Sequence, residues 1–270
     1  MFGKLGYQVF RATEGNVDVL GKIVENVSNV NSVGYKKRQA TFIETLNGEI
    51  AKQESTNFSQ GPLRKTSDIY DLALDGPGFF EVELPNGQRA YTRAGRFKLS
   101  SEGELVTLEG YRVIPEVEQQ AKTVIEANNT NNDELGLNIK VTTPKLTISS
   151  DVTPEILEDG TVNGINPATG EKTKIGKINV VVFNNPQGLE SIHKGYYLST
   201  NLSGPPQDTE VGMNSASKVK QGFLEFGNVD IAAEFLKLSQ IKNILSAQMK
   251  LLKTIDKIHE QVNYTIGKSA

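Results

Sequence analysis

The sequence predicts an α+β fold, in which long N- and C-terminal helices pair as a coiled-coil-like helical hairpin and the central domain is all-β, built of short strands. Apolar residues recur at helical spacing near both ends of the chain, and no proline or glycine interrupts residues 228–266. The centre consists of short alternating runs separated by glycine and asparagine. We therefore expect a helical domain from residues 1–46 and 228–270, and a β-rich domain from residues 47–227.

The N-terminal helix is predicted from the spacing of its apolar residues. They recur at Val9, Val17, Leu20, Val24 and Val27, with Ile23 beside them. The next segment, NVSNVNSVGY at residues 26–35, is typical of a helix exit, because asparagine and serine side chains compete for backbone hydrogen bonds. Gly34 can adopt the left-handed conformation that caps many helices. We therefore expect the helix to end within this segment.

The central strands are predicted from short alternating runs. These runs are Tyr70–Leu74, Phe79–Leu84, Arg89–Thr92, Gly95–Leu99 and Leu105–Leu108, and Lys177–Phe183 is an apolar run suited to a more buried strand. Asn86-Gly87 separates two of them, and this dipeptide is a strong hairpin signal. Phe79 and Phe80 should point to opposite faces of their strand, one into the core and the other toward a subunit contact. Many short strands with close turns favour a sandwich or irregular barrel.

Residues 116–138 differ in amino-acid composition from the rest of the central region. The segment is polar and includes the run NNTNN at residues 128–132. One short helix over residues 117–127 is compatible with its sequence. We expect an exposed insertion, and a tolerated loop without a role of its own is the alternative.

The C-terminal helix carries a heptad pattern. Within each of three adjacent columns, the residues are seven positions apart and mostly apolar. The first two columns are Leu238, Leu245, Leu252 and His259, and Ile241, Gln248, Ile255 and Val262. The third column is Ile244, Leu251 and Ile258. Asn228 follows a glycine and is suited to cap the start of the helix. Acidic residues near that start and lysines near the end suit the helix dipole.

The length and width of this apolar stripe predict assembly. A helix over residues 228–262 is about 50 Å long, whereas a compact β domain of this size is about 40 Å across. Two helices cannot cover so wide a stripe, so further copies should cover it. A monomeric helical hairpin that caps the β domain is the alternative. The expected subunit-interface residues are Val17, Leu20, Val24, Val27, Ile231, Phe235, Leu238, Ile241, Ile244, Leu245, Leu251, Leu252, Ile255, Ile258 and Val262.

Composition disfavours several classes of protein. Net charge is −3, and no basic run exceeds Lys36–Arg38, so no nucleic-acid partner is expected. The chain has no cysteine, which excludes disulfides and thiolate metal sites. It has no apolar stretch long enough for a transmembrane helix or a cleaved signal peptide. If it acts outside the cytoplasm, we expect export by another route.

The sequence offers little for catalysis. His193 and His259 are the two histidines, and neither lies in a motif that activates a nucleophile. Asp68, Asp71 and Asp75 match no calcium-loop spacing, and the glycines that follow Asp75 precede a strand rather than a phosphate-binding helix. We expect no enzyme activity, no cofactor, no metal and no small-molecule substrate.

Seven motifs, in order, resemble those of the bacterial flagellar basal-body rod and hook proteins, especially rod subunits of the FlgG/FlgF type. The motifs are NVSNVNSVGYK at 26–36, QGPLRKT at 60–66, DLALDGPGFF at 71–80, YTRAGRF at 91–97, FNNPQGL at 183–189, QGFLE at 221–225 and GNVD at 227–230. The residues that carry the match best are Asn26, Asn29, Asn31, Gly34, Tyr35, Asp75, Gly76, Gly78, Phe79, Phe80, Tyr91, Thr92, Arg93, Gly95, Asn228 and Val229.

The resemblance implies a function and a location. In that family the paired terminal helices form the inner wall of a tube, and the β domain faces outward. Subunits are exported through the flagellar type III apparatus without signal cleavage, and they assemble into a periplasm-spanning rod that transmits torque. Partners would be copies of the chain, other rod and hook subunits, the export apparatus and surrounding ring proteins. This chain departs from the family pattern at Val27-Ser28 and at Ile241–Ile244.

Two other functions remain as alternatives. One is a β-rich adhesin or glycan-binding module on a helical oligomerisation stalk, which predicts aromatic side chains gathered on one exposed face. The other is a hydrolase that depends on His193. The expected function is a structural, self-assembling subunit of the bacterial flagellum.

Overall fold

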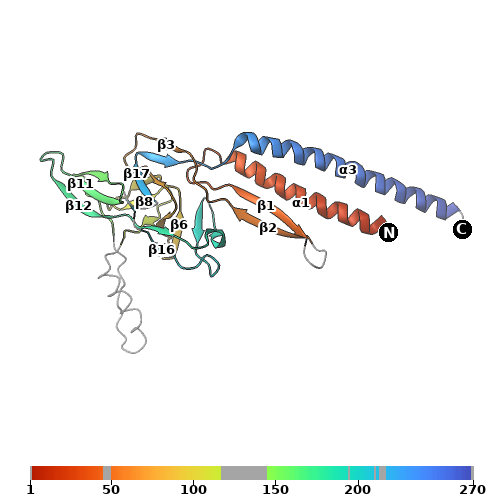
Figure 1. Cartoon of the computed structure of the whole chain (residues 1–270), viewed down its shortest axis with the longest axis horizontal. Coiled ribbons are helices and arrows are strands. Elements are labelled where there is room, and N and C mark those ends of the chain that lie inside the picture. Colours follow the sequence, from red (N-terminus) through yellow and green to blue (C-terminus); the bar gives the residue numbers. More distant parts are fainter. Residues whose placement is uncertain are drawn as a thin grey trace, which may run out of the picture. The chain divides into compact units, whose positions relative to one another are not determined.

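The computed structural model describes residues 2–44, 50–116, 145–193, 195–209, 211–212 and 217–268. Helix α1 (Phe2–Ser28) and helix α3 (Ile231–Lys268) lie at the two ends of the chain, and the described residues between them form strands and turns (Figure 1). This confirms an α+β fold with a β-rich centre. Within the described residues, no helix is both long enough and apolar enough to cross a membrane. The expected insertion, apart from Glu116, lies outside the described residues.

The contacts divide the chain into two compact units. One unit, the helical unit, contains α1, α3 and a hairpin formed by strands β1 (Arg38–Glu44) and β2 (Ile50–Thr56). The strands are antiparallel, with Arg38 opposite Thr56. The other unit, the β unit, holds residues 58–227 together with residues 32–35. The hairpin therefore lies with the helices in this division, whereas the sequence places residues 47–56 with the β domain.

The starts and ends of the helices differ in two details from those expected. The carboxylate of Asp230 accepts a hydrogen bond from the N–H of Ala233 (3.2 Å), so Asp230 caps α3 and Asn228 does not. Helix α1 ends at Ser28, six residues before Gly34. Gly34 has the expected left-handed φ of 68°, but its N–H bonds to the carbonyl of Glu225 and not to the helix. Asn228 was the expected cap, whereas the acidic residues that follow it were considered only for their effect on the helix dipole.

The β unit is built around one large sheet. Its strands pair in the order β14-β15-β6-β5-β9-β8-β7, and β13 pairs with both β5 and β16. The bounds are β5 (Phe79–Glu83), β6 (Arg89–Thr92), β7 (Phe97–Leu99), β8 (Leu105–Thr107), β9 (Arg112–Val113), β13 (Val180–Val182), β14 (Glu190–Ser191), β15 (Tyr196–Leu198) and β16 (Gln207–Asp208). The Asn86-Gly87 turn joins β5 to β6 as predicted, with Glu83 opposite Arg89 and Gly87 at φ 80°.

Smaller antiparallel sheets complete the unit. A three-stranded sheet has the order β10-β11-β12, and two further pairs join β17 to β4 and β18 to β3. Their bounds are β3 (Leu63–Lys65), β4 (Leu72–Asp75), β10 (Thr153–Ile156), β11 (Thr161–Ile165), β12 (Lys172–Lys177), β17 (Lys218–Gln221) and β18 (Phe223–Glu225). A short 3-10 helix, η1, spans Pro186–Gly188. Strands β3 and β4 thus pair with β18 and β17, which come some 150 residues later in the chain.

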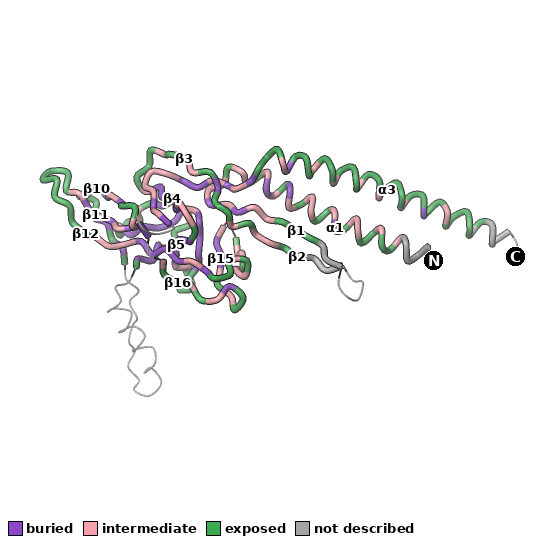
Figure 2. Tube along the Cα trace, in the orientation of Figure 1, coloured by how far each residue is buried: buried purple, intermediate pink, exposed green. Residues whose placement is uncertain are grey.

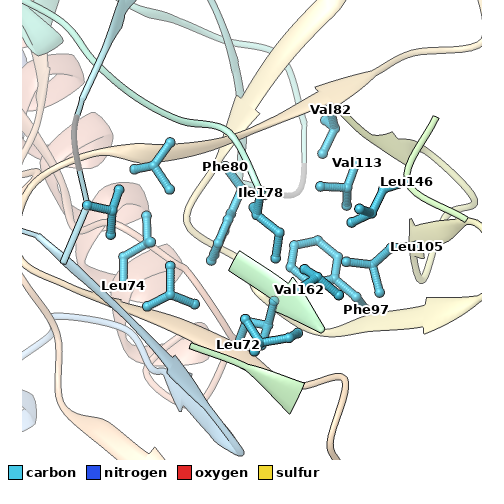
Figure 3. Packing of buried hydrophobic residues seen from close by; sticks show 14 of the residues in the cluster. Leu72, Leu74, Phe80, Val82, Phe97, Leu105, Val113, Leu146, Val162 and Ile178 are labelled. Carbon is cyan, nitrogen blue, oxygen red and sulfur yellow. The ribbon is translucent and has the colours of Figure 1, made fainter. Parts of the chain in front are cut away.

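The core of the β unit contains two clusters of buried side chains. The larger cluster, part of which Figure 3 shows, comprises Leu72, Leu74, Phe80, Val82, Ala90, Phe97, Leu105, Val113, Leu146, Ile148, Ile156, Val162, Ile178, Val180, Tyr196, Val211 and Val219. The smaller one comprises Phe79, Tyr91, Val181, Phe183 and Tyr197. Figure 2 shows that buried positions concentrate in these central strands. Burying one large apolar side chain contributes about 1.5–3 kcal/mol, so the two clusters dominate the stability of the unit.

Phe79 and Phe80 lie on opposite faces of β5, as predicted, but neither is available to another subunit. Phe80 packs edge-to-face against Phe97, with ring centroids 5.2 Å apart. Phe79 is only 4% exposed and contacts the rings of Phe58, Phe183 and Tyr197. The expectation of a subunit contact at this strand was wrong, because the sequence does not reveal that a second cluster covers the opposite face of the sheet.

Gly95 should be intolerant of any side chain. A Cβ atom at this position would overlap the carbonyl oxygen of Leu72, and that backbone is itself bonded to Gly95 through the Leu72 N–H (2.8 Å). We expect Gly95→Ala to lower the free energy of unfolding by about 3 kcal/mol. Urea denaturation followed by tyrosine fluorescence measures it. Gly21→Ala on α1, where a Cβ meets nothing within 4 Å, is the control and should be neutral or stabilising by about 0.5–1 kcal/mol. Equal stability of the two variants would contradict the expectation.

Candidate functional site

Helices α1 and α3 lie side by side and run antiparallel (Figure 1). Three contacts along them show the direction. A Cβ at Gly6 would lie 3.9 Å from Ile255, the amide of Asn16 bonds to that of Gln248 (3.2 Å), and Asn26 bonds to Glu234 (3.4 Å). Residue numbers rise along α1 as they fall along α3. We call the surface shared by the two helices the seam.

The expected interface residues divide by exposure. Ile255 is buried, and seven others are partly buried, namely Leu20, Val27, Leu238, Ile241, Leu245, Leu252 and Ile258. The rest are exposed, namely Val17, Val24, Ile231, Phe235, Ile244, Leu251 and Val262. The expected set therefore combines residues that the helical unit itself covers with residues that it leaves in water.

One exposed stripe lies on α1. Phe10, Val17 and Val24 fall seven residues apart and are each 51–52% exposed. We call these three residues the outer stripe. Phe10 was not among the expected residues, although its spacing of seven from Val17 is the signal that identifies it. On α3, Ile244 and Leu251 form a second exposed row with the same spacing, and Phe235, Leu236 and Met249 are exposed as well. Large exposed apolar patches mark interaction surfaces in proteins, so these rows are candidates for such a surface.

Buried polar groups fix the end of the helical unit where β1 begins. Asn26 makes two hydrogen bonds to the backbone of Arg38. Its side-chain N–H donates to the Arg38 carbonyl (2.8 Å), and its side-chain oxygen accepts from the Arg38 N–H (2.9 Å). Glu234, 1% exposed, pairs with Lys37 (2.5 Å). A buried carboxylate is tolerated because the lysine compensates its charge. The first asparagine of the NVSNVNSVGYK motif therefore joins α1 to the hairpin.

Asn228 ties the two ends of the hairpin together. Its side-chain oxygen accepts from the N–H of Lys37 (2.7 Å), and its amide donates to the carbonyl of Asn57 (2.8 Å). The N–H of Asn57 in turn bonds to the carbonyl of Lys37 (2.8 Å). Val229, the next residue of the motif, is buried. The GNVD motif therefore positions the chain as it enters α3.

In the β unit, the motifs meet at a buried ion pair. Arg93 is 3% and Glu225 1% exposed, and their charged groups are 3.0 Å apart. Arg93 also donates to the carbonyls of Gly78 (2.9 Å) and Gly76 (2.8 Å), while Glu225 accepts from the N–H of Gly61 (2.7 Å). Burial lowers the pKa of Arg93, and the carboxylate of Glu225 opposes this shift. We call this set the motif junction, because it joins four of the seven motifs.

Glycines surround the motif junction where backbones approach closely. A Cβ at Gly34 would overlap the backbone of Ala94, and Gly34 has a positive φ that disfavours side chains. Thr92 bonds to the carbonyl of Gly195 (3.0 Å) and accepts from the N–H of Ala94 (3.0 Å). The backbone of Gly34 thus passes close to the YTRAGRF segment, and its N–H bonds to the carbonyl of Glu225 (2.8 Å), which brings in a fifth motif.

The remaining motif residues have local roles. Gln60 accepts from the N–H of Gly76 (2.9 Å) and lies beside Asp75, whose pKa is lowered by its hydrogen bond with Lys220. Burial in the smaller core cluster raises the pKa of Tyr91 to about 12. Asn29 donates to the carbonyl of Glu25 near the end of α1 (2.9 Å). Asn31 is exposed and Tyr35 is partly buried.

The described residues offer no arrangement suited to metal binding. None of them form a group of three or more His, Cys, Asp or Glu side chains that could hold a metal ion. Asp71 pairs with Arg96 (3.8 Å), and Asp68 accepts from the N–H of Tyr70 (2.9 Å). His193 lies at the surface beside the hydroxyl of Tyr111 (3.2 Å).

Comparison with known proteins identifies relatives along most of the chain. Residues 73–164 match the family model described as the flagellar hook protein FlgE/F/G D1 domain. The flagellar basal-body rod protein FlgG of Buchnera aphidicola (subspecies Schizaphis graminum) is 30% identical over 266 residues, which cover 89% of this chain and 91% of the relative. The FlgG proteins of Borreliella burgdorferi and Bacillus subtilis are also 30% identical, covering 91% of both chains in each case.

The two charges of the Arg93–Glu225 pair should depend on each other, so that removing one costs more stability than removing both. Arg93→Met leaves a buried carboxylate without its counter-charge, and we expect a loss of about 3–5 kcal/mol in the free energy of unfolding. Arg93→Met with Glu225→Gln removes both charges and should lose less than Arg93→Met alone. Urea denaturation of both variants measures the difference. The control is Lys172→Met, which breaks an exposed pair with Glu155 and should cost about 1 kcal/mol or less. A double variant that loses as much stability as Arg93→Met alone, or more, would argue against coupling within the pair.

Proposed function

The chain belongs to the family of flagellar basal-body rod proteins, and we propose that its terminal helices polymerise it into the axial drive shaft that transmits torque between motor and hook. It is a structural subunit of the rod, as its FlgG relatives are by name. The comparisons give no support to an adhesin. The family is a structural one, and the absence of catalysis is part of the proposal.

The exposed apolar rows of α1 and α3 carry this proposal. The outer stripe and the α3 residues Phe235, Ile244 and Leu251 are each 44–54% exposed. Covering them would contribute on the order of 5 kcal/mol for each helical unit, since full burial of one such side chain contributes about 1.5–3 kcal/mol. A monomer gains no free energy from leaving these apolar side chains exposed to water. In a rod, neighbouring copies of the chain would cover these side chains.

The two exposed rows favour an open assembly. The outer stripe on α1 and the Ile244–Leu251 row on α3 differ in sequence, so contact between one and the other is heterologous, and such contacts form filaments when the rotation does not close. Charges near them are complementary: Glu14 and Asp18 on α1 are acidic and exposed, whereas Lys250, Lys253 and Lys257 on α3 are basic and exposed. In this proposal the α1 row of one copy contacts the α3 row of the next.

The finer organisation also belongs to the proposal. The helices would pair as a coiled-coil-like hairpin, for which the heptad spacing and the antiparallel contacts are the support. The division into a tube-forming domain of residues 1–46 and 228–270 and an outer domain of residues 47–227 stays a prediction, and the hairpin at residues 38–56 is where the contacts suggest another boundary. Other rod and hook subunits, surrounding ring proteins and the export apparatus are the expected partners. The expected location is the periplasm-spanning rod, reached without a cleaved signal.

The exposed rows should be needed for assembly and not for folding. We expect Val17→Ser with Leu251→Ser to raise the critical concentration for rod formation at least about tenfold, because losing two buried apolar side chains costs about 1.4 kcal/mol or more. Pelleting and electron microscopy measure assembly, and urea denaturation should show stability within about 1 kcal/mol of the unaltered chain. Asn243→Ser, an exposed substitution on α3, is the control and should assemble normally.

Deletion of the gene tests the function itself. We expect cells that lack the chain to be non-motile, with a basal body that stops at the rod. Imaging of the basal body measures this directly. Intact rods and normal motility in the deletion strain would refute the proposal.

A further inference from the structure

The seam contains one pair of amides where apolar residues are expected. Asn16 donates to Gln248 across a distance of 3.2 Å, and both side chains are partly buried. On α1 the residues seven positions away are Val9 and Ile23, and on α3 they are Ile241 and Ile255. Each amide therefore interrupts an apolar column. The pair satisfies a donor and an acceptor that would otherwise be costly to bury.

Two rows of residues on α1 differ in polarity, and this difference suggests a role for the Asn16–Gln248 pair. Asn16, which bonds to Gln248 on α3, lies in a row with Val9, which is partly buried, and Ile23, which is buried, and we call this row the inner stripe. The outer stripe, one residue further along, contains Phe10, Val17 and Val24. The two rows are separated by about 100° around the helix. The outer stripe is entirely apolar and the inner one is not, so burial of apolar area alone would turn the outer stripe toward α3.

We propose that the Asn16–Gln248 pair selects which stripe of α1 faces α3, and thereby keeps the outer stripe free for a neighbouring copy. If α1 turned its outer stripe to the seam, Gln248 would lie against Val17 with no hydrogen-bond partner. The unpaired amide disfavours that arrangement. The Asn26 contacts with Arg38 and Glu234 act in the same direction, ten residues further along α1. That a neighbouring copy binds the outer stripe rests on the proposed rod function. The inference about which stripe of α1 faces α3 does not.

The sharpest test removes only the α3 member of the pair. In Gln248→Leu, the observed facing buries Asn16 without a partner, whereas the alternative facing returns Asn16 to water and places Val17 against leucine. A Val17→Cys reporter measures the facing, because the chain has no other cysteine. The rate of thiol modification is followed in the full chain, at a concentration where sedimentation shows a monomer. We expect modification to slow at least about tenfold in Gln248→Leu, the ratio that one unpaired buried amide implies.

Three further variants separate this inference from trivial effects. Gln248→Asn keeps an amide in the seam and should leave modification fast. Asn243→Leu adds the same leucine on an exposed part of α3 and should also leave it fast. Asn16→Leu with Gln248→Leu makes the inner stripe apolar and should recover at least part of the rate. Unchanged modification of Val17→Cys in Gln248→Leu would overturn the inference, as would equal slowing in Asn243→Leu.

The same samples distinguish this inference from the rod proposal. Modification is measured on monomers, so its outcome does not depend on assembly. If Gln248→Leu covers the outer stripe but the unaltered chain forms no rods, the rod proposal fails and the inference stands. If the unaltered chain forms rods and Gln248→Leu leaves the stripe reactive, the inference fails and the rod proposal stands.

Discussion

The antiparallel contact between α1 and α3 is the constraint on which the rest of the structure depends. These helices come from opposite ends of the chain, so every element between them must return the chain to the same place. The Asn16–Gln248 and Asn26–Glu234 contacts join residues more than 200 positions apart. Closing so long a loop costs conformational entropy, which only extensive contacts recover. The paired strands β3–β18 and β4–β17 provide such contacts, because they join early and late segments of the β unit.

The motif junction shows why short motifs scattered along the sequence depend on one another. Arg93 satisfies two glycine carbonyls and one carboxylate, and that carboxylate satisfies the N–H of Gly61. Arg93, Glu225, Gly61 and Gly78 are buried and Gly76 is partly buried, so the loss of one group leaves a covered partner without compensation. The motifs are therefore parts of a single hydrogen-bonded arrangement. Their glycines are present because main chains pass too closely for a Cβ atom, as at Gly34.

The sequence was a good guide where local patterns decide the structure. Alternation identified β5 and β6, and Asn86-Gly87 identified their turn, because strand faces and turn conformations depend on neighbouring residues. It was a poor guide where a distant partner decides. Asn228 was expected to cap α3, but it bonds to Lys37, 191 positions away. Phe79 was expected to meet another subunit, but a second aromatic cluster buries it. The heptad count grouped the expected interface residues into one set, and their burial in the structure divides that set into covered and exposed residues.

The direction of the two helices has a mechanical consequence. A force along their common axis would slide one helix past the other and load the seam in shear. The close approach of the helices at Gly6 and the hydrogen bonds of Asn16 and Asn26 are spread along that axis, so the contacts along the seam would bear the force together rather than one after another. A force across the axis would instead peel the helices apart from one end. A subunit built in this way resists axial sliding better than peeling, and its resistance should grow with the length of the seam.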